Sequence, residues 1–557
     1  VQVYAYQGEE PNVAHQFTLR GKLTEVKPTQ VQVSFNNHQH PISFFSDPSK
    51  RFALEHDHVD SGITVLCRSL AMLLSLPTER QADFLLTTLP PEAEILPLLG
   101  SYGKFDELVA KERASKRWFL VIGPPGSGKT SCALRYMVEE ELRATPDGHI
   151  LLMAYTNRAV DELCGMLEEI IKSSPDLLID YLRLGHVVSA SPQYHDRMME
   201  SRLDKEGAKS DVVRQLLADT RIVVATVSTM SLQTTLLRTM HFDVAFVDEA
   251  SQILEPYILP VYVEQSVDRY VLVGDQKQLP AVVMQNSSMS AITDKVLQDA
   301  GLHNCAESLF SRMLHRFMSM GRQDFYYQIN TQGRMHPELF RFVNQQFYCN
   351  RLKPVPLKHQ SRSIEELYPV VPALKGSRYA LLRQLATRRT LFVDCKPVHD
   401  GLNDKVNSAE AKAVARVVDM LAKLYEANGR TLSADNVGVI VPYRNQISMV
   451  RTCLQQRGLQ QFMDMTIDTV ERYQGSQRDI IIYSFTVRHV SQLDFLTSSL
   501  YKENDNGSGY WVDRKLNVAL TRSREQLIVI GNKQLLKQVS VYKSMLDTIE
   551  SQDKKQS

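Results

Sequence analysis

Short runs of apolar residues alternate with amphipathic segments along most of the chain. The first half has such runs at 118–122, 150–155, 222–225, 244–247 and 270–273, and the second half has them at 391–394, 437–441, 480–483 and 527–530. Runs of this length between helical segments are typical of buried parallel strands with helices on both faces of the sheet. The pattern therefore predicts an α/β fold with two doubly wound parallel-sheet domains, at 101–325 and 326–557.

The N-terminal part of the chain has a different pattern. Residues 1–60 alternate polar and apolar positions with a period of two, which predicts a β-rich accessory domain, either a small barrel or a sheet. Residues 61–100 are expected to form a helical stalk, whose packed face would carry Leu66, Leu70, Leu73 and Leu74, and then a proline-containing linker. A polar insert at 176–219 is expected to be helical and exposed.

The run at 118–122 is followed by a glycine-rich segment and then by a helical pattern. A phosphate-binding loop needs glycines because its backbone N–H groups must curl around the phosphate, and the start of the helix adds partial positive charge. We expect Lys129 to neutralise the β- and γ-phosphates and Thr130 to ligate Mg²⁺. The alternative is a chance glycine-rich turn. Because every fixed position is filled, a nucleoside triphosphate is expected at Gly123, Pro124, Pro125, Gly126, Ser127, Gly128, Lys129 and Thr130.

Polar residues follow the other predicted strands of the first domain, at the sheet edge where ligands bind. We assign Asp248 to Mg²⁺ and Glu249 to activation of the attacking water. The amide of Gln278 could hydrogen-bond the γ-phosphate and that water, although this stretch alone could be a tight turn. Two further strand ends could be mere helix N-caps; they carry Thr156, Asn157, Thr226 and Ser228.

These strand ends, separated by helical segments, describe one RecA-like doubly wound domain at 101–325. Residues 326–557 repeat the α/β pattern without a second phosphate loop. The second RecA-like domain is therefore expected to complete a nucleotide site that the first domain begins.

Composition limits the partners of the chain. Its 64 basic and 63 acidic residues give a net charge of +1, so a nucleic-acid site should be a local groove. The 7 cysteines are scattered without a Cys-x-x-Cys pair, which argues against a zinc or iron–sulfur site and indicates reduced thiols in the core. No apolar run approaches the roughly 20 residues that span a bilayer. We therefore expect no membrane partner and a cytoplasmic location, or a nuclear one in a eukaryote.

The chain begins with Val1 rather than with methionine, which suggests a fragment or a processed form. Upstream domains or a nuclease partner would be compatible with that beginning.

Several segments occur in a characteristic order. They are Asp-Glu-Ala-Ser at 248–251, Gly-Asp-Gln-Lys-Gln-Leu at 274–279, Gln-Gly-Arg-Met-His-Pro at 332–337, Tyr-Gln-Gly-Ser-Gln-Arg-Asp at 473–479 and Leu-Asn-Val-Ala-Leu-Thr-Arg-Ser-Arg at 516–524. Together they resemble the superfamily 1B helicases, in the branch that includes the nonsense-mediated-decay RNA helicase and the Okazaki-fragment nuclease-helicase. The resemblance runs from about Phe119 to Asn532.

The resemblance implies that Arg334 and Arg522 reach from the second domain to the γ-phosphate, where a guanidinium neutralises charge that develops during hydrolysis. For either arginine alone, a surface salt bridge is the alternative. It also implies that Glu410 and Gly475 approach the sugar and phosphates. The nucleic-acid backbone would be held by Thr156, Asn157, Thr226 and Ser228 on the first domain and by Pro442, Tyr443, Arg444 and Thr469 on the second.

Two departures from the family concern the base of the nucleotide. Gly333 occupies the position where the family usually has a tyrosine that stacks on adenine, and the usual glutamine-containing segment is not recognisable in 101–116. Tyr443 or another aromatic residue could stack instead, although its place after 441–442 also fits a strand contact. His336 is expected to be a packed structural histidine.

We interpret the sequence as an ATP-dependent, Mg²⁺-requiring 5′-to-3′ helicase or translocase that acts as a monomeric motor on single-stranded nucleic acid. The phrase Thr-Val-Glu-Arg-Tyr-Gln-Gly at 469–475 favours DNA over RNA. The alternatives are an RNA helicase of the same branch and a nucleic-acid-stimulated ATPase that remodels nucleoprotein complexes without unwinding. A switch or scaffold without turnover is disfavoured by the presence of Lys129, Asp248, Glu249, Gln278, Arg334 and Arg522.

Overall fold

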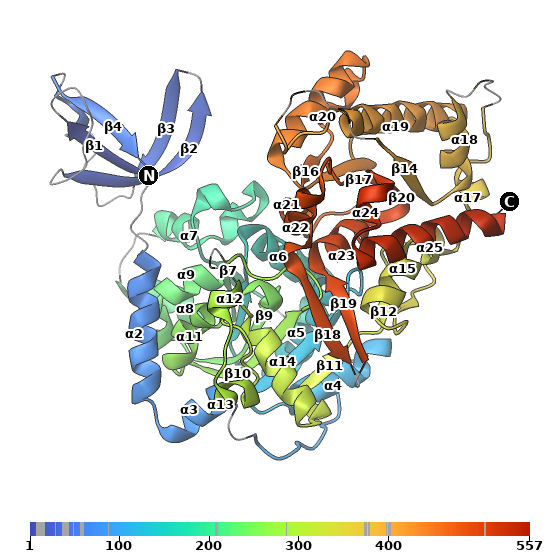
Figure 1. Cartoon of the computed structure of the whole chain (residues 1–557). Helices are drawn as coiled ribbons and strands as arrows, with labels where there is room; N and C mark the ends of the chain where they lie inside the picture. Colours follow the sequence, from blue (N-terminus) through green and yellow to red (C-terminus); the bar gives the residue numbers. More distant parts are fainter. Residues whose placement is uncertain are drawn as a thin grey trace.

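Two parallel β-sheets form the framework of the structure, a computed structural model shown in Figure 1. It describes residues 1–6, 17–27, 29–35, 44–47, 49–55, 61–86, 89–177, 179–206, 210–283, 285, 287–372, 376, 379–396, 398, 401, 403–505 and 508–556. The first sheet has seven parallel strands in the order β11-β5-β10-β9-β6-β8-β7. These strands are Tyr326–Gln328 (β11), Trp118–Ile122 (β5), Val267–Gly274 (β10), Phe242–Asp248 (β9), Ile150–Ala154 (β6), Ile222–Thr226 (β8) and Tyr181–Arg183 (β7).

The strands of the first sheet are buried on both faces, as their unbroken apolar runs predicted. Trp118 and Leu120 face one core, whereas Phe119 and Val121 face the other, because successive side chains of a strand point to opposite faces. One face is covered by Asp106–Ala114 (α4), Arg135–Ala144 (α5) and Asn157–Ser173 (α6). The other face is covered by Val227–Leu232 (α9), Thr234–Thr239 (α10), Glu255–Val263 (α11) and Leu309–Ser319 (α14).

The second sheet has five parallel strands in the order β14-β20-β17-β15-β16. They are Thr390–Asp394 (β14), Ser523–Gly531 (β20), Arg478–Ser484 (β17), Val437–Val441 (β15) and Ile467–Thr469 (β16). One face packs against Ala380–Thr387 (α18), Ser408–Ala427 (α19) and Arg444–Gln456 (α20). The other packs against Pro337–Phe347 (α15), Val470–Tyr473 (α21), Arg514–Leu520 (α23) and Ser540–Gln556 (α25). The α/β fold class expected from the sequence is thus observed.

The sequence placed the boundary between the two domains slightly too early. Strand β11 at 326–328 pairs in parallel with β5 and so belongs to the first sheet, just beyond the expected limit at 325. With three residues, β11 is too short to give a hydrophobic pattern of its own.

The N-terminal residues form an antiparallel sheet in the order β3-β2-β1-β4. Its strands are Gln2–Tyr6 (β1), Thr18–Lys27 (β2), Gln30–Phe35 (β3) and Arg51–Glu55 (β4). The sheet stands beyond the end of helix Ser61–Ser75 (α2), and Figure 1 shows it apart from both parallel sheets. Helix Thr78–Leu85 (α3) then leads toward the first domain.

Helix α2 packs through a different face from the one expected. Leu73 is buried, but Leu70 and Leu74 are 49% and 77% exposed, so the expected leucine face was wrong. Met72 and Leu73 of the helix pack into the core of the first domain together with Leu76, which follows the end of the helix. Both sides of the helix are apolar, and the hydrophobic pattern alone could not tell which one meets α11.

The insert at 176–219 is only partly helical. It contains helices Met199–Glu206 (α7) and Ser210–Asp219 (α8), but it also contributes the buried strand β7 to the sheet edge. Arg183 in this strand is fully buried and forms an ion pair with Asp161 at 2.9 Å. The expectation of an entirely helical and exposed insert was therefore wrong.

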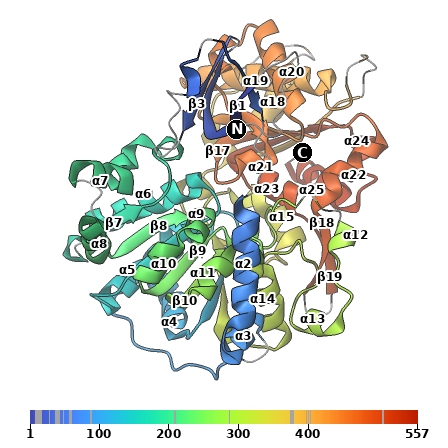
Figure 2. The same ribbon diagram turned by 90° about the vertical axis from the view of Figure 1, so that its left-hand side faces the viewer.

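A long hairpin extends from the second domain along the first. Its strands are Leu500–Asp505 (β18) and Ser508–Asp513 (β19), which pair antiparallel. Figures 1 and 2 both place this hairpin beside α14. Lys277 of the first domain donates a hydrogen bond to the hydroxyl of Tyr510 on the hairpin at 2.6 Å. The hairpin thus belongs to the contact between the two domains.

The cysteines are all free, and three of them, Cys67, Cys305 and Cys349, are exposed. The expectation that the thiols lie in the core was therefore wrong for these three. In the part of the chain that the structure describes, no helix combines the length and apolarity needed to cross a membrane.

Glu410 lies in the core of the second domain rather than near a nucleotide. It is fully buried near the start of α19, and its carboxyl oxygens accept hydrogen bonds from the hydroxyl of Ser484 (2.7 Å) and from the backbone N–H groups of Thr486 (2.7 Å) and Val487 (3.1 Å). Thr486 has a φ of 55°, which is strained for a β-branched residue. The predicted approach of Glu410 to the nucleotide is therefore wrong, because the carboxyl group secures this strained turn instead.

We expect Glu410→Ala to lower the free energy of unfolding by about 3 kcal/mol or more, because it leaves buried N–H and O–H donors without an acceptor. The affinity of the folded variant for ATP should be unchanged. Denaturant titration measures the first quantity, and ATP titration of the folded protein measures the second. A stable variant with strongly weakened ATP binding would contradict the structural role.

Candidate nucleotide site and nucleic-acid interface

A cavity of about 710 Å³ lies between the two parallel-sheet domains. The first domain contributes residues 124–130 of the phosphate loop together with Glu249 and Gln278, and the second contributes Arg334, Gly475 and Arg522. Of the other residues expected at the nucleotide, Gly123 begins the loop, Asp248 lies behind Thr130, and Glu410 is in the core. The structure therefore gathers nearly all of the expected residues around one space.

The phosphate loop connects β5 to a helical segment that begins with a π-helical turn at Lys129–Leu134. Gly126 and Gly128 have φ values of 72° and 79°, a region that favours glycine. A Cβ atom at Gly126 would also lie 2.4 Å from the Cβ of Arg334. Glycine at this position is therefore needed both for the turn and for the close approach of the second domain.

Thr130 and Asp248 form the expected pair behind the loop. The Thr130 hydroxyl donates a hydrogen bond to Asp248 Oδ2 at 2.6 Å. Asp248 ends β9 and is 3% exposed, and burial, together with the neighbouring charge of Glu249, raises the pKa of its carboxyl. A hydroxyl oxygen and a carboxylate oxygen, both hard ligands, thus lie side by side next to the loop.

Glu249 faces the cavity beside Lys129, whose Nζ lies 3.7 Å from Glu249 Oε1. Burial alone would raise the pKa of Glu249, but the charges of Lys129 and Arg522 outweigh it and hold the pKa below its usual range. Its Oε2 accepts hydrogen bonds from the amides of Gln252 (3.1 Å) and Gln474 (3.3 Å). The side chain is therefore an ionised, oriented carboxylate that can accept a proton.

The two arginines concentrate positive charge on the second-domain side. Arg522 is 2% exposed, and burial, with the nearby charge of Arg334, lowers the pKa of Arg522 to about 9. Burial also lowers the pKa of Arg334 to about 10. Arg334 donates a hydrogen bond to Gln477 Oε1 at 2.9 Å. Arg522 is buried and Arg334 is half-buried, and both lie beside the same cavity, so a bound anion would stabilise this arrangement.

Some residues at the site were missed by the sequence analysis. Gln474 contacts Glu249, and Gln477 contacts Arg334. Both glutamines lie in segment 473–479, which carries the family resemblance, so the sequence did contain a signal for them. Tyr348, which contacts the turn that carries Gln278, gave no signal because it looks like the last apolar residue of a helix.

The residues expected to contact nucleic acid follow strands at the carboxyl edges of both sheets. The hydroxyl oxygens of Thr156 and Thr226 each accept a backbone N–H bond at the start of a helix, so both act as N-caps. Thr226 and Thr469 are only 7% and 8% exposed and offer little surface to a partner. The more accessible members of the set are Thr156, Asn157, Ser228, Pro442 and Arg444.

Tyr443 does not lie at the nucleotide site. Its ring stacks on Phe495 with centroids 4.9 Å apart and an angle of 24° between the rings. It is absent from the lining of the inter-domain cavity. The alternative in which Tyr443 stacks on adenine is therefore wrong.

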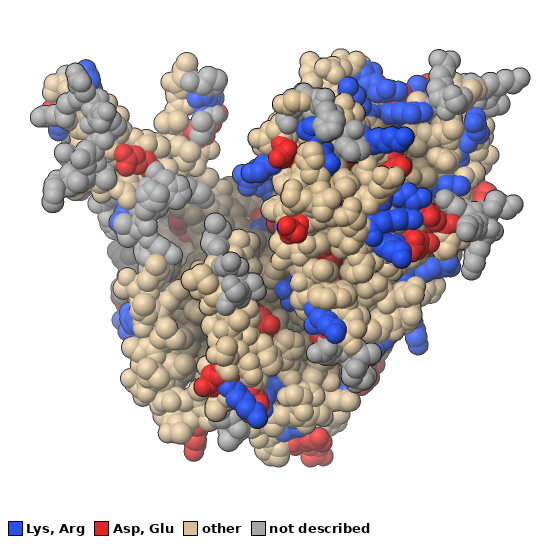
Figure 3. Space-filling model, viewed as in Figure 1, with Lys and Arg blue, Asp and Glu red and all other residues tan. Residues whose placement is uncertain are grey.

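The surface is hollowed between the N-terminal sheet and the second domain, as Figure 3 shows. Basic side chains border this hollow on the side of the second domain in the same view. A local groove of this kind is compatible with a net charge close to zero.

The cavity wall around Gly333 is largely aliphatic. The Gly333 N–H donates to the Gly126 carbonyl at 2.7 Å, and a Cβ at Gly333 would lie 3.1 Å from Leu357 Cδ1. Leu357 and Val355 thus occupy the space beside position 333 where the family usually has tyrosine. The polar groups of this wall already have partners: Lys104 donates to Thr331, and a ring nitrogen of His359 bonds to the Arg334 carbonyl.

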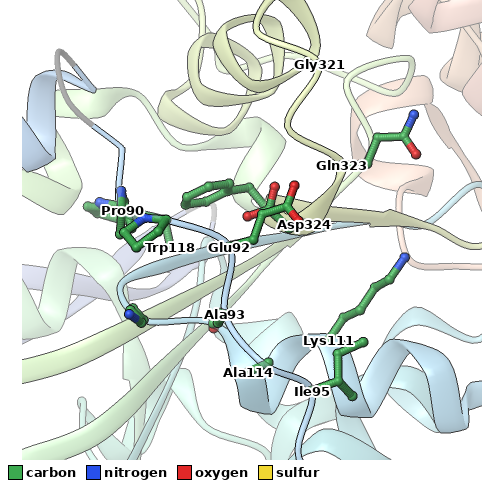
Figure 4. A pocket seen from close by; sticks show the side chains of 14 residues that line it. Pro90, Glu92, Ala93, Ile95, Lys111, Ala114, Trp118, Gly321, Gln323 and Asp324 are labelled. Atoms are coloured by element: carbon green, nitrogen blue, oxygen red, sulfur yellow. The ribbon is translucent and has the colours of Figure 1, made fainter.

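A second cavity, of about 400 Å³, is shown in Figure 4. It is lined by Trp118 at the start of β5 and by Pro90, Glu92, Lys111 and Asp324, among others. The phosphate loop follows the other end of the same strand, so this cavity lies at the opposite edge of the sheet. None of the residues expected at the nucleotide lines it.

The fold and the site define a two-domain P-loop ATPase whose nucleotide cavity is completed by arginines of the second domain. This is the arrangement of a helicase. A family model described as an AAA domain matches residues 106–210 and 190–286, and another model with the same description matches residues 305–534.

Two curated relatives are helicases by name. The DNA replication ATP-dependent helicase/nuclease DNA2 of Xenopus laevis is 27% identical over 484 residues, covering 85% of this chain and 41% of that protein. Helicase sen1 of Schizosaccharomyces pombe is 27% identical over 337 residues, covering 60% and 17%. The solved structure of an arterivirus helicase, nonstructural protein 10, with DNA has 12% identity and a TM-score of 0.35, covering 74% of this chain and 60% of that one.

The two domain models, which together match residues 106–286 and 305–534, and the helicase relatives support a superfamily 1B helicase of the DNA2 and Sen1 branch that hydrolyses ATP. It spans 41% of the length of the Xenopus relative, so the activities of that whole protein do not transfer automatically.

We expect weak discrimination among ATP, GTP, CTP and UTP, because the aliphatic side chains of Val355 and Leu357 form the wall beside Gly333. Values of kcat/KM should agree within roughly tenfold, whereas a pocket built to hydrogen-bond its substrate can discriminate by about 10⁴. Steady-state hydrolysis with each nucleotide and saturating single strands tests this. As a control, Leu357→Ala should weaken all four similarly. A hundredfold preference for ATP would contradict the prediction.

Proposed function

We propose that the chain is a 5′-to-3′ helicase that acts as a monomer on single-stranded nucleic acid, with DNA favoured, and couples ATP hydrolysis between its two domains to strand movement. The observation that carries this proposal is the single cavity shared by Lys129, Glu249, Arg334 and Arg522. Because the two arginines belong to one domain and the phosphate loop to the other, the charge of the nucleotide would determine how closely the domains approach.

The residues behind the loop fit Mg²⁺. Hard divalent cations prefer oxygen ligands, and the Thr130 hydroxyl and the Asp248 carboxylate supply them within 2.6 Å of each other. When bound, Mg²⁺ would neutralise charge on the β- and γ-phosphates. Around it, Lys129 would hold the same phosphates and Asp248 would keep the Thr130 hydroxyl oriented.

Hydrolysis would use Glu249 as the acceptor of the proton of the attacking water. Gln252 and Gln474 orient this carboxylate, and the low pKa of Glu249 keeps it ionised at neutral pH. Arg334 and Arg522 would stabilise charge on the transferred phosphoryl group, and Gln278 would bond the γ-phosphate and the water. Gly475 would approach the nucleotide from the same side as the arginines.

The strand would lie across the carboxyl edges of both sheets, in the hollow below the N-terminal sheet. Accessible backbone-binding groups there are Thr156, Asn157, Ser228 and Arg444, with Pro442, Tyr443, Thr226 and Thr469 shaping the surface. Contacts to phosphates hold a strand without reading its bases, as a translocating motor requires.

DNA is favoured over RNA because several relatives, in Xenopus, Homo and Bos, are named DNA replication ATP-dependent helicase/nucleases. The name "DNA polymerase alpha-associated DNA helicase A" in Saccharomyces points the same way. The remaining candidates are an RNA helicase of the same branch and an ATPase that remodels nucleoprotein complexes without unwinding. The protein would work in the cytoplasm or the nucleus, and upstream domains or a nuclease partner would be compatible with this function.

Unwinding of tailed duplexes separates these candidates. We expect ATP-dependent strand separation of a DNA duplex with a 5′ single-stranded tail, and little separation with a 3′ tail. Matched RNA and DNA–RNA duplexes, tested at the same salt concentration, rank the substrates. Efficient unwinding from 3′ tails would overturn the polarity, whereas stimulated ATPase without separation would favour the remodelling function.

Substitutions in the cavity test the catalytic roles. Lys129→Ala should abolish ATP binding. Glu249→Gln should retain binding while hydrolysis falls by about 10² to 10⁴, because the carboxylate no longer accepts a proton. Arg522→Ala should also retain binding and lose about 10³ or more of the stimulated rate. Nucleotide titration and steady-state turnover measure both quantities. Normal turnover by Glu249→Gln or Arg522→Ala would remove that residue from its role.

A further inference from the structure

The turn at 275–278, which follows β10 and carries Gln278, is bound to the second domain at every position. Each of its residues makes at least one hydrogen bond across the seam between the domains. In chain order, the bonds join Asp275 to Tyr348 (2.7 Å), Gln276 to Arg514 (2.8 Å), Lys277 to Tyr510 (2.6 Å) and Asn517 (2.7 Å), and Gln278 to Arg522 (3.2 Å). The position of this turn therefore depends on the second domain.

Tyr348 is fixed by the backbone that surrounds it. It follows α15 and is 1% exposed. The next two residues, Cys349 and Asn350, have φ values of 51° and 57°, which are uncommon for residues with side chains. The side chain of Asn344 closes this turn with two hydrogen bonds of 3.0 Å to the backbone of Leu352. The Tyr348 hydroxyl is thereby held at a defined place in the seam.

This hydroxyl joins two elements that contact the nucleotide cavity. It donates a hydrogen bond to Asp275 Oδ2 at 2.7 Å and accepts one from Asn517 Nδ2 at 2.9 Å. Asn517 lies on α23, the helix that leads into Arg522. Burial raises the pKa of Tyr348 well above its usual range, so the hydroxyl keeps the proton that it donates.

The Asp275 carboxylate in turn fixes the amide of Gln278. Its Oδ2 also accepts a hydrogen bond from Gln278 Nε2 at 3.0 Å, and its Oδ1 accepts one from the Lys277 N–H at 3.0 Å. With Nε2 committed to Asp275, Gln278 Oε1 is turned toward Arg522 Nη2 at 3.2 Å. The opposite orientation would set an NH₂ donor against a guanidinium, which is also only a donor. One carboxylate therefore selects one of the two amide orientations.

We propose that Tyr348 is a positioning residue for ATP hydrolysis: it holds Asp275 so that Gln278 presents its amide oxygen toward Arg522 and the phosphate site. This inference rests on the proposed function, because it requires Gln278 at the γ-phosphate. Tyr348 and Gln278 belong to different domains, so the amide is set only while the seam is closed. Tyr348 acts through Asp275 and does not itself touch the nucleotide.

Tyr348→Phe removes this hydroxyl and keeps the ring, over which the Lys277 ammonium lies at 5.3 Å. We expect kcat for hydrolysis stimulated by single-stranded DNA to fall about tenfold, which corresponds to about 1.4 kcal/mol in activation free energy, while the KM for ATP stays within about twofold. Asp275→Asn, which alters the accepting carboxylate and leaves Tyr348 in place, should reduce kcat to a similar degree.

The matched control is Tyr368→Phe. Tyr368 is also 1% exposed and lies in the second domain, where its hydroxyl donates to Gln526 Oε1 at 3.0 Å. Tyr368→Phe loses one buried hydrogen bond and Tyr348→Phe loses two, so thermal unfolding should shift to lower temperature for both variants and further for Tyr348→Phe, but only Tyr348→Phe should lower kcat.

A double-mutant comparison decides whether Tyr348 acts through Gln278. In a Gln278→Ala background, Tyr348→Phe should cause no further loss of kcat. An additive loss, or an unchanged kcat in Tyr348→Phe, would overturn the inference while leaving the motor intact. If Gln278→Ala itself turned over normally, the assignment of Gln278 within the proposed function would fall, and the inference with it.

Discussion

Buried positive charge at the seam between the domains is the constraint on which the rest of the structure depends. Lys129 from the first domain meets Arg334 and Arg522 from the second around one cavity, and burial lowers the pKa of both arginines. Glu249, 3.7 Å from Lys129, balances only part of this charge, and buried cations in excess of carboxylates oppose closure unless an anion balances them. A bound triphosphate supplies the balancing negative charge, and the site loses part of that charge when the released γ-phosphate departs after hydrolysis. The same charges that bind the nucleotide thereby give the domains a physical reason to close and to open.

The two domains can approach this closely only because the backbone of the phosphate loop contacts the backbone of the second domain. The Gly333 N–H reaches the Gly126 carbonyl at 2.7 Å, and a side chain at Gly126 would collide with Arg334. Glycine at position 333 thus accompanies a close contact between the phosphate loop and the second domain. Leu357 covers the space beside it. The departure from the family pattern changes the wall of the cavity but leaves the charged groups in place.

The sequence predicted those parts of the fold and site where chemistry restricts residue types at fixed spacing. Strands β5 and β15 are buried on both faces, so every position had to be apolar, and the hydrophobic pattern marked them clearly. The phosphate loop and the pair Asp248 and Glu249 were predictable for a similar reason. By contrast, β7 and β11 are too short for a pattern, and the stalk helix α2 has two apolar sides, of which the sequence could not select one.

Residues that act through other residues escaped prediction for a different reason. Glu410 bonds to Ser484, which lies 74 positions away, and Tyr348 bonds to Asp275, 73 positions away. Nothing near either residue in the chain indicates these partners, because Glu410 meets Ser484 only when the second domain folds, and Tyr348 meets Asp275 only when the two domains come together. A residue that touches the substrate is restricted by the substrate's chemistry, and a motif results. A residue that orients such a substrate-contacting side chain is restricted only by geometry, and more than one type of side chain could meet that requirement. Part of the communication between the two domains therefore depends on residues that a motif does not reveal.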